Sequence, residues 1–267
     1  MSRFVITGST KGIGLALAQY AASQGHDVAI SGRSQQAVDE AMSRIAATRG
    51  QLLGVPTDVT DAQQVQALWD RAAEAFGGVD VWINNAGVAH TTHGILDTPA
   101  DKLQAMVTTN LFGTIHGSRV AARGMTAQGR GRIFNILGGG SDGEYFPGMG
   151  IYGTTKRGLD YFTRALVKEL KGTPIIVGRV RPGMVVTEGV LREIQSDPAG
   201  SAKSRKTMNN LCDLPETVAP YLIEQMLAAS KSGTKIAWLT GGKIAKRMLL
   251  GRFKPREDLF AKAGVAT

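Results

Sequence analysis

The stretch Thr7-Gly8-Ser9-Thr10-Lys11-Gly12-Ile13-Gly14 decides the fold of this chain. It follows a short apolar run at residues 4–7 and opens a segment of helical composition at residues 13–23. Glycines allow the backbone to turn tightly and to approach a pyrophosphate closely. The N-terminus of the following helix would offer unpaired N–H groups and partial positive charge to the same group. Because a simple strand-to-helix connection can also be rich in glycine, the meaning of this turn depends on the rest of the chain.

Beyond the turn, apolar runs alternate with helix-like segments. Strands are expected at residues 28–31, 52–56, 79–83, 132–137, 175–179 and 235–239, and helices at 35–47, 62–76, 101–125, 152–170 and 215–228. Apolar strands that alternate with helices predict a parallel sheet covered on both faces. A length of 267 residues suits one α/β domain. We therefore expect a single Rossmann-type, doubly wound α/β domain over residues 1–241.

Two segments depart from this alternation. Residues 188–213 are polar and follow a predicted strand, and ligands of open parallel sheets bind beyond the carboxyl ends of the strands. This segment is predicted to be an irregular flap over the active site, with a surface loop of no function as the alternative. Residues 242–267 form a basic tail, and the part of the chain from Lys231 onward carries seven of the nine net positive charges.

The tail also contains large apolar residues, and on a helix Ile244 and Met248 are four positions apart, as are Leu249 and Phe253. Such a helix can lie in the headgroup layer of a membrane, with its cations against anionic lipid. It can equally pack its apolar side on the protein's own body or on a second subunit. The sequence leaves both alternatives open, and nucleic acid is not expected as a partner.

Composition excludes several other classes of protein. No apolar run reaches the ~18 residues that a membrane-spanning helix needs. The first residues lack the pattern of a secretory signal, and the lone Cys212 cannot form an internal disulfide, which favours a cytoplasmic protein that could lie peripheral to a membrane. No metal site is expected, because the four histidines lack ligand partners at useful spacing: His26, His90, His93 and His116.

The end of the second predicted strand bears on the choice of cofactor. Ser31-Gly32-Arg33 follows it, where an NAD-binding protein usually places an acid that hydrogen-bonds the ribose 2′-hydroxyl. Arg33 can instead bind a 2′-phosphate through charged hydrogen bonds. Lys11 in the Gly-rich turn would add a second positive charge. The alternative for each is an exposed surface cation, and the two together predict NADPH.

Tyr152 and Lys156 are candidates for acid–base catalysis. They are one helical turn apart and therefore share a face of the predicted helix. An ammonium group beside a phenol lowers the phenol's pKa from its usual value near ~10. Tyr152 could then give a proton to a carbonyl oxygen as hydride reaches the carbon. An exposed helix face is the alternative for this common spacing.

These motifs together resemble the short-chain dehydrogenase/reductase family. The turn, Asn84-Asn85-Ala86-Gly87, Tyr152-x-x-x-Lys156 and Pro182-Gly183 occur in that family's order and spacing, over residues 3–241. The resemblance implies a Rossmann-type sheet, a nicotinamide cofactor and assembly as a dimer or tetramer. It also implies the cofactor contacts, which are Gly8, Ser9, Thr10, Lys11, Gly12, Ile13, Gly14, Arg33, Asp58, Val59, Asn85, Ala86, Gly87, Tyr152, Lys156, Pro182, Gly183, Val185 and Thr187. Among these, Asp58 and Val59 would touch the adenine and Thr187 the nicotinamide amide.

The resemblance implies two further catalytic residues, with one departure. Asn110 resembles the family's asparagine that bends a helix and holds a relay water. The family usually has a serine about thirteen residues before the tyrosine, where Gly139 stands here, and the nearest serine is Ser141. Ser141 is predicted to replace it, because flanking glycines can adopt the positive φ values of a looped-back path. If Ser141 does not, Gly138 and Gly139 would provide space for a large flat substrate.

This glycine-flanked serine is similar to that of the plant chlorophyll b reductases. The similarity extends from residue 133 to 239 and includes Gly138–Ser141, Pro182-Gly183-Met184-Val185 and Leu214-Pro215-Glu216-Thr217-Val218-Ala219. It implies NADPH-dependent reduction of a formyl group to hydroxymethyl on a chlorophyll or a related tetrapyrrole. A reductase of another bulky aldehyde or ketone stays open. So does a catalytically silent NADPH-sensing protein that kept the fold.

Overall fold

Seven parallel strands form the centre of the computed structural model, which describes residues 1–45, 49–196, 205, 207–253 and 256–262. They are β1 (Arg3–Ile6), β2 (Asp27–Gly32), β3 (Leu52–Pro56), β4 (Val81–Asn84), β5 (Gly131–Ile136), β6 (Ile175–Arg181) and β9 (Lys235–Ala237). Their order across the sheet is β3-β2-β1-β4-β5-β6-β9, with every neighbouring pair parallel. The strand order reverses between β1 and β4, which is where a doubly wound sheet opens a crevice for a ligand. The predicted fold class is confirmed.

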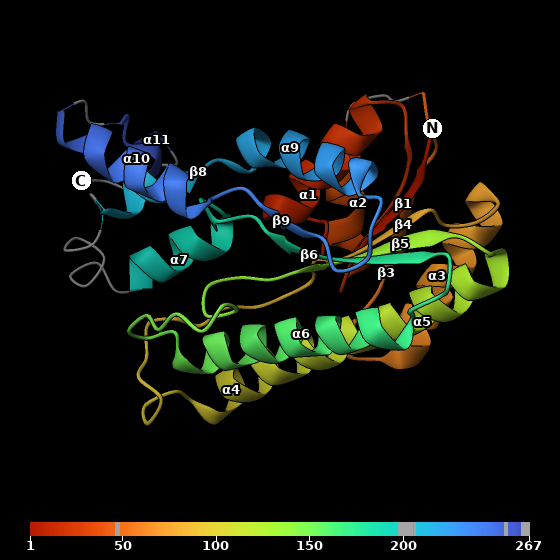
Figure 1. Cartoon of the computed structure of the whole chain (residues 1–267), viewed down its shortest axis with the longest axis horizontal. Coiled ribbons are helices and arrows are strands. Elements are labelled where there is room, and N and C mark those ends of the chain that lie inside the picture. The colour runs from red at the N-terminus through yellow and green to blue at the C-terminus, as the bar shows by residue number, and fades with distance from the viewer. Residues whose placement is uncertain (46–48, 197–204, 206, 254–255, 263–267) are drawn as a thin grey trace.

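Helices cover both faces of the sheet (Figure 1). One layer contains α1 (Gly12–Ser23), α2 (Gln35–Ser43) and α9 (Pro215–Ala228), and the other contains α3 (Ala62–Phe76), α5 (Thr114–Gln128) and α6 (Gly150–Glu169). Strand β1 serves both layers, since Phe4 and Ile6 lie in one core and Val5 in the other. All three side chains are fully buried, which explains the uninterrupted apolar run in the sequence.

Local sequence sets several helix ends. The Asp61 carboxylate accepts hydrogen bonds from the backbone N–H groups of Gln63 and Gln64 at the start of α3. Gly77 and Gly129, in the left-handed conformation, end α3 and α5. Helix α2 ends at Ser43, a little earlier than expected, and residues 46–48 of the expected helix lie outside the described residues.

The single helix expected over residues 101–125 is three consecutive segments in the structure. They are α4 (Ala100–Met106), the π-helix η1 (Val107–Gly113) and α5. Asn110 lies within η1 and is fully buried. A π-helical turn inside an α-helix occurs frequently at functional sites. It is consistent with the bend that the family resemblance implies around this asparagine.

The segment expected to be an irregular flap is partly regular. Residues 188–196 form the helix α7 (Glu188–Ser196), and β7 (Met184–Val185) pairs in parallel with β8 (Cys212–Asp213). Helix α7 is amphipathic, and its apolar residues Val190, Leu191 and Ile194 pack against a small core. That core explains why a polar stretch is ordered as a helix, and the expectation of irregular structure there was wrong. Residues 197–204 and 206 lie outside the described residues.

The basic tail forms two helices, α10 (Gly241–Phe253) and α11 (Leu259–Lys262). Arg247 and Arg256 both form ion pairs with the buried carboxylate of Asp213, at 2.8 Å and 2.9 Å. Residues 254–255 and 263–267 lie outside the described residues. In the part of the chain that the structure describes, no helix is long and apolar enough to cross a membrane.

Candidate active site

The Gly-rich turn follows β1 and leads into α1 as the sequence predicts. Gly8 and Gly12 have φ values of +62° and +55°, which favour glycine. A Cβ at Gly8 would lie 2.7 Å from the Cα of Ala86, and one at Gly14 would lie 2.5 Å from the carbonyl oxygen of Gly8. No larger residue fits without displacing backbone. Glycine at these positions therefore lets the turn pack closely on Ala86 at the N-terminus of α1.

Two polar side chains tie the turn to its neighbours. The Ser9 hydroxyl donates to the Ile6 carbonyl and accepts from the backbone N–H of Ser31, at the end of β2. The Asn85 amide donates to the carbonyls of Thr7 and Gly8 at 3.0 Å and 2.9 Å. The predicted residues after β1, β2 and β4 are thus brought together at the carboxyl edge of the sheet.

The cations expected at the 2′-phosphate lie on exposed surface around this edge. Lys11 caps the start of α1, and Arg33 follows β2 directly. Gly32 packs so closely on the turn that a Cβ there would lie 2.4 Å from the Thr10 methyl. Lys11 and Arg33 are therefore both exposed, one in the Gly-rich turn and the other directly after β2.

Asp58 and Val59, which the family resemblance predicts to touch the adenine, follow β3. The Asp58 carboxylate accepts hydrogen bonds from the backbone N–H and the hydroxyl of Thr60. Val59 is buried, and its side chain is close enough to Gly113 that a Cβ there would lie 2.5 Å from it. The loop after β3 is thereby fixed against η1.

Tyr152 and Lys156 project from the first half of α6. The Lys156 Nζ donates to the Ile136 carbonyl at 3.2 Å and lies 5.5 Å from the centroid of the Tyr152 ring. Burial raises the pKa of Tyr152 to about 12 and lowers the pKa of Lys156 to about 8. The expectation that Lys156 lowers the pKa of the phenol was wrong for this structure, because burial dominates. The nearby charge that lowers the pKa of Tyr152 is Arg181.

Asn110 links η1 to the loop after β4 and to α6. Its side-chain oxygen accepts from the Val88 N–H at 2.8 Å, and its amide donates to the Val88 carbonyl and the Thr155 hydroxyl, both at 3.0 Å. A Cβ at Gly87 would lie 3.2 Å from the Asn110 oxygen and 3.6 Å from the Lys156 Nζ. The structure therefore gathers Asn110, Gly87 and Lys156 in one place.

Ser141 does not take the place predicted for it. Its side chain is fully buried, and its hydroxyl has no hydrogen-bond partner among the described residues, so it does not bond the Tyr152 hydroxyl. Gly138 lies beside the Tyr152 hydroxyl, because a Cβ at Gly138 would lie 2.3 Å from the Tyr152 oxygen. Gly140, with φ of +86°, turns the chain here and packs against Gly153.

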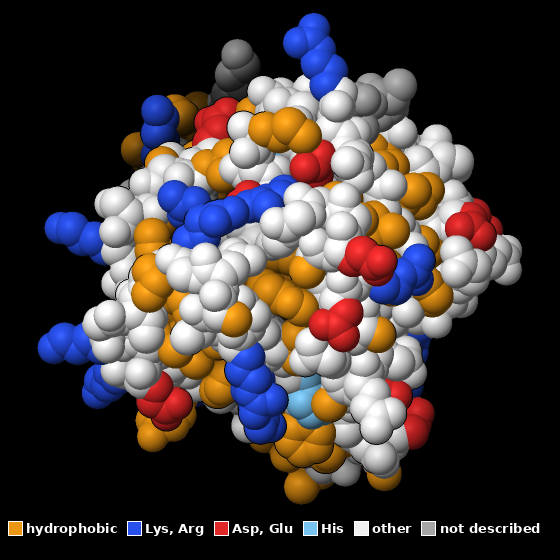
Figure 2. Space-filling view, turned by 90° about the vertical axis from the view of Figure 1, so that its right-hand side faces the viewer, with side chains coloured by type: hydrophobic (Ala, Val, Ile, Leu, Met, Phe, Trp, Pro, Cys, Tyr) orange, Lys and Arg blue, Asp and Glu red, His pale blue; other side chains and the backbone are white. Residues whose placement is uncertain are grey.

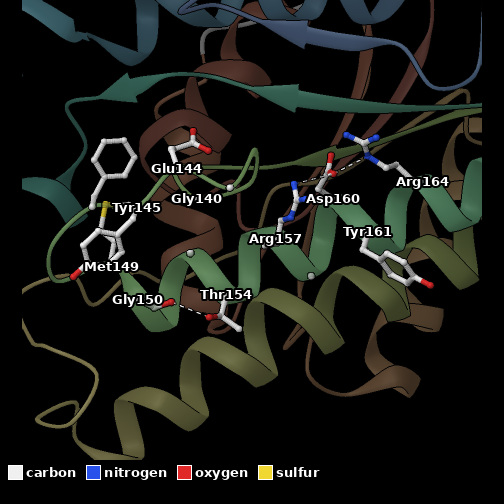
Figure 3. Close-up of a pocket in the computed structure, with 14 residues that line it drawn as sticks. Gly140, Glu144, Tyr145, Met149, Gly150, Thr154, Arg157, Asp160, Tyr161 and Arg164 are labelled. Atoms are coloured by element: carbon white, nitrogen blue, oxygen red, sulfur yellow. Dashed lines mark hydrogen bonds and ion pairs between the residues drawn. The ribbon is translucent and has the colours of Figure 1, made fainter.

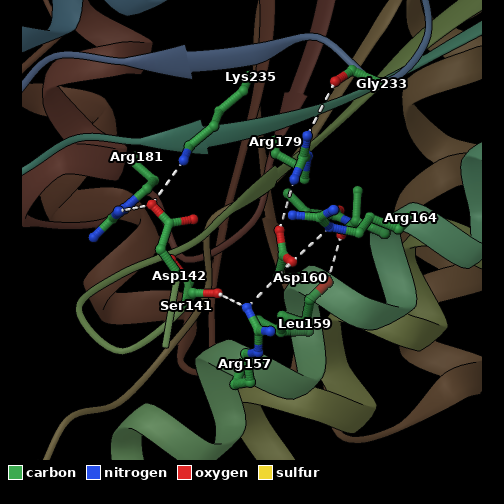
Figure 4. Close-up of polar contacts among 12 residues, drawn as sticks. Ser141, Asp142, Arg157, Leu159, Asp160, Arg164, Arg179, Arg181, Gly233 and Lys235 are labelled. Carbon is green, nitrogen blue, oxygen red and sulfur yellow. Dashed lines mark hydrogen bonds and ion pairs between the residues drawn. The ribbon is translucent and has the colours of Figure 1, made fainter. Parts of the chain in front are cut away.

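The position of Ser141 has a physical cause in the contacts of its loop (Figure 4). Arg157, one turn beyond Tyr152, donates to the Ser141 carbonyl at 3.0 Å. Lys235 donates to Asp142 at 2.7 Å, and Arg181 pairs with the same carboxylate. Arg181 also pairs with Glu144. These contacts hold the loop by its backbone and its acidic residues. The Ser141 hydroxyl in this loop is buried and has no hydrogen-bond partner among the described residues.

The end of β6 contributes the residues expected to cover the cofactor. Pro182 is buried, and Gly183 adopts a φ of +79°, so the chain turns sharply before β7. Val185 is buried and pairs in register with Asp213 of β8. Thr187 and Glu188 lie over the Gly-rich turn, since a Cβ at Gly12 would be 3.2 Å from a Thr187 carbon and 3.6 Å from a Glu188 oxygen.

Glu193 is a functional candidate that the sequence did not reveal. From α7 it accepts a hydrogen bond from the Thr91 N–H at 2.9 Å and another from the Thr91 hydroxyl, and it lies 3.9 Å from His90 Nδ1. Its charge raises the pKa of Tyr152. The contact joins segments about a hundred residues apart, which no local motif could indicate. Helix α7 is thus fastened to the loop after β4.

A separate pocket of about 740 Å³ lies along the outward side of α6 (Figure 3). Tyr145, Met149, Arg157 and Tyr161 contribute to its wall. None of the predicted catalytic or cofactor residues line this pocket. It is therefore distinct from the site around Tyr152. The described residues contain no group of three or more His, Cys, Asp or Glu side chains that could hold a metal ion.

Comparison with known proteins agrees with this arrangement. The family model for short chain dehydrogenases matches residues 3–197. A chloroplastic chlorophyll(ide) b reductase of Arabidopsis thaliana is 35% identical over 266 residues, covering 94% of this chain and 75% of that protein. Another Arabidopsis protein, named as a probable chlorophyll(ide) b reductase, is 34% identical over 258 residues, covering 90% of this chain. The chain spans about half the length of that second relative, which is covered to 51%.

Solved structures agree as well. A short-chain type dehydrogenase/reductase from Mycobacterium marinum superposes with a TM-score of 0.78 at 27% identity, covering 91% of this chain and 95% of that one. A short chain dehydrogenase from Burkholderia cenocepacia, solved in complex with NADP, gives a TM-score of 0.74 at 28% identity, covering 88% and 95%. The chain is therefore an oxidoreductase of the short-chain dehydrogenase/reductase family, most like the chlorophyll b reductases.

Proposed function

We propose that the protein reduces a carbonyl group with NADPH, and that its substrate is the formyl group of chlorophyll b or a related tetrapyrrole. The observation that carries the catalytic part is the Tyr152 hydroxyl, held beside Gly138 with Lys156 on the same face of α6. The similarity to chlorophyll b reductases over nine-tenths of the chain supports the substrate.

The residues around the Gly-rich turn fit a nicotinamide dinucleotide. Gly8 and Gly14 let the turn pack closely on Ala86 and Asn85, and the N-terminus of α1 that follows attracts a pyrophosphate. Exposed Lys11 and Arg33 fit a 2′-phosphate, which supports NADPH rather than NADH. When bound, the cofactor supplies a hydride to the carbonyl carbon of the substrate.

The chain's own residues then handle the proton and the geometry. Tyr152, whose pKa of about 12 keeps it protonated at neutral pH, gives its proton to the carbonyl oxygen. Lys156 is placed to hold positive charge beside the ring, and Asn110 fixes the backbone at Val88 next to it. Helix α7, fastened through Glu193, helps to exclude water from the site.

A large planar substrate suits the glycines at the end of β5. Gly138 and Gly139 carry no side chain where the family's serine stands, so the Tyr152 hydroxyl packs directly on Gly138 and Met149 lies against Gly139. By resemblance to the family we also propose a dimer or tetramer, which analytical ultracentrifugation would measure.

The deciding experiment measures NADPH oxidation by the purified protein with three substrates: chlorophyllide b, a small aldehyde and a bulky aldehyde without a tetrapyrrole. The proposal expects chlorophyllide b to be reduced with the highest kcat/KM and to yield a hydroxymethyl product by mass spectrometry. Turnover of only the bulky aldehyde would show that the substrate is a bulky aldehyde without a tetrapyrrole. Tight NADPH binding without turnover of any carbonyl would instead indicate a cofactor-sensing protein.

A further inference from the structure

Helix α7 contributes no buried side chain of its own among the residues that the structure describes. Its apolar residues Val190, Leu191 and Ile194 are only half-buried, and they pack against a small core. A segment with few buried contacts opens locally at low cost in free energy. The position of α7 therefore depends on the residues that make up this core.

The largest buried member of that core comes from the end of the chain. In the described part of the chain, the buried members are Val186, Cys212 and Phe260, and the last of these belongs to α11. The Phe260 side chain is only 1% exposed. The core that orders α7 is therefore completed by the ring of Phe260, a residue far later in the chain.

Buried polar contacts hold this end of the chain in place, and we call residues 256–262 the C-terminal segment. The Arg256 guanidinium donates to the Asp213 carboxylate at 2.9 Å. The Asn209 side-chain oxygen accepts a hydrogen bond from the Leu259 N–H, also at 2.9 Å. Asp213 and Asn209 are both buried, where water competes little for these hydrogen bonds. The C-terminal segment is therefore fixed beside β8 and the residues that precede it.

On another side, α7 contacts the active site. Glu193 accepts a hydrogen bond from the Thr91 N–H, in the loop after β4, at 2.9 Å. Just before the helix begins, Thr187 lies against the Gly-rich turn, since a Cβ at Gly12 would be 3.2 Å from a Thr187 carbon. In Figure 1, α7 lies between α10 and α11 on one side and α6 on the other. A change in the C-terminal segment can therefore reach the active site through α7.

We propose that the C-terminal segment positions α7 over the active site, and that Phe260 is the residue on which this position depends. This role for Phe260 rests on the proposed function, because Thr187 and Glu193 would then lie beside the cofactor and the carbonyl substrate. Phe260 acts through α7, so it is a positioning residue and not a catalytic one. Without its ring, α7 should leave the Gly-rich turn in a large fraction of the molecules, and ligands must then close it again when they bind.

The test compares Phe260→Ala with the parent by hydrogen exchange of the full chain without ligands and by steady-state kinetics. Exchange at the Thr91 amide should become at least about 10-fold faster, because Glu193 moves away with α7. If α7 is open in about nine-tenths of the molecules, the Kd for NADPH and the KM for the carbonyl substrate should rise by about 10-fold. The kcat should fall by only about two- to threefold, since bound ligands restore the closed position.

Two variants and one reference amide separate this role from general stability. Phe253→Ala removes the same ring from α10, where it is 82% exposed, and should behave as the parent does. Phe260→Leu keeps an apolar side chain in the core and should restore most of the parent's KM. The Arg132 amide, near the start of β5, donates to the Asp80 carbonyl at 2.9 Å and should exchange as in the parent. That edge of the sheet, where the strands begin, faces the viewer in Figure 2, with charged side chains of both signs among polar and apolar ones.

Several outcomes would overturn the proposal. Parental exchange at Thr91 in Phe260→Ala would do so. Equal acceleration at Thr91 and Arg132 would do so as well, because the ring would then stabilise the whole domain rather than α7. Glu193→Ala should raise KM less in Phe260→Ala than in the parent, and fully additive effects would show that Phe260 does not act through α7.

A second variant covers the case in which Phe260→Ala does not fold. Asn209→Ala removes the bond to the Leu259 N–H and leaves the apolar core intact. Faster exchange at Thr91 in this variant would support the proposal, and parental exchange would overturn it. If the parent reduces no carbonyl, the proposed function fails, while exchange at Thr91 still decides whether the C-terminal segment holds α7.

Discussion

Replacing Gly138 by alanine would place a methyl group against the catalytic hydroxyl. The new Cβ would lie 2.3 Å from the Tyr152 oxygen and 3.1 Å from the ring carbon that bears it. Ordinary contact begins at 3.4 Å. The hydroxyl or the loop must therefore move by about 1 Å, and a misplacement of that size in a catalytic group can cost about 100-fold in rate.

We accordingly expect Gly138→Ala to lower kcat for carbonyl reduction by about 100-fold. The Kd for NADPH should stay within a few-fold of the parent, because the Gly-rich turn is untouched. Both are measured on purified protein, by steady-state NADPH oxidation and by titration of cofactor fluorescence. Overpacking can also cost about 1–3 kcal/mol of stability, so the Tm of the variant is recorded alongside.

The matched control is Gly139→Ala, in the place where the family's serine stands by count. Its Cβ would lie 2.9 Å from the terminal methyl of Met149, the far end of a flexible side chain. That methyl can move aside, so this variant should keep most of its activity. If Gly138→Ala is as active as Gly139→Ala, then Tyr152 does not act from the position that the structure gives it.

Four further changes test the assigned roles. Tyr152→Phe should lower turnover by about two to four orders of magnitude and spare NADPH binding, whereas near-parental turnover would exclude it as proton donor. Burial lowers the pKa of Lys156 to about 8, so this side chain is charged below that pH and neutral above it. The rate of reduction should therefore fall as pH rises through about 8, and a flat pH profile would contradict this. Arg33→Ala should reduce the preference of kcat/KM for NADPH over NADH by about 10- to 100-fold, and an unchanged ratio would remove Arg33 from the 2′-phosphate site. In the parent protein the Thr91 amide donates to the Glu193 carboxylate, so Glu193→Ala should speed hydrogen exchange at that amide. The same variant should raise KM more than it lowers kcat. Unaltered exchange would show that the contact does not hold in solution.

Local chemistry made much of the fold and the site predictable. The alternation of apolar runs with helical segments indicated the parallel sheet, because buried parallel strands are apolar on both faces. The Gly-rich turn could also be predicted from the sequence, since only glycine adopts the conformations at Gly8 and Gly12 at little cost. The i, i+4 spacing by itself places Tyr152 and Lys156 on one face of a helix.

Other features depend on contacts between distant segments. The pKa of Tyr152 is raised because the folded chain buries the ring, which spacing on a helix does not indicate. The Ser141 hydroxyl is buried without a hydrogen-bond partner among the described residues, and Arg157 from α6 holds the Ser141 carbonyl. The thirteen-residue count to the family's serine could not show which atom would face the hydroxyl, and the structure places Gly138 there.

Helix α10 shows most clearly which features the sequence determines and which only the tertiary structure decides. The sequence determined that the tail is basic and amphipathic, because charge and periodicity are properties of the chain itself. It left open which side would face the protein. Only the tertiary structure decided this, since the buried carboxylate of Asp213 requires positive partners and finds them in Arg247 and Arg256. Arg247 turns inward to that charge, and Leu249, Leu250 and the other apolar side chains of α10 are left at the surface.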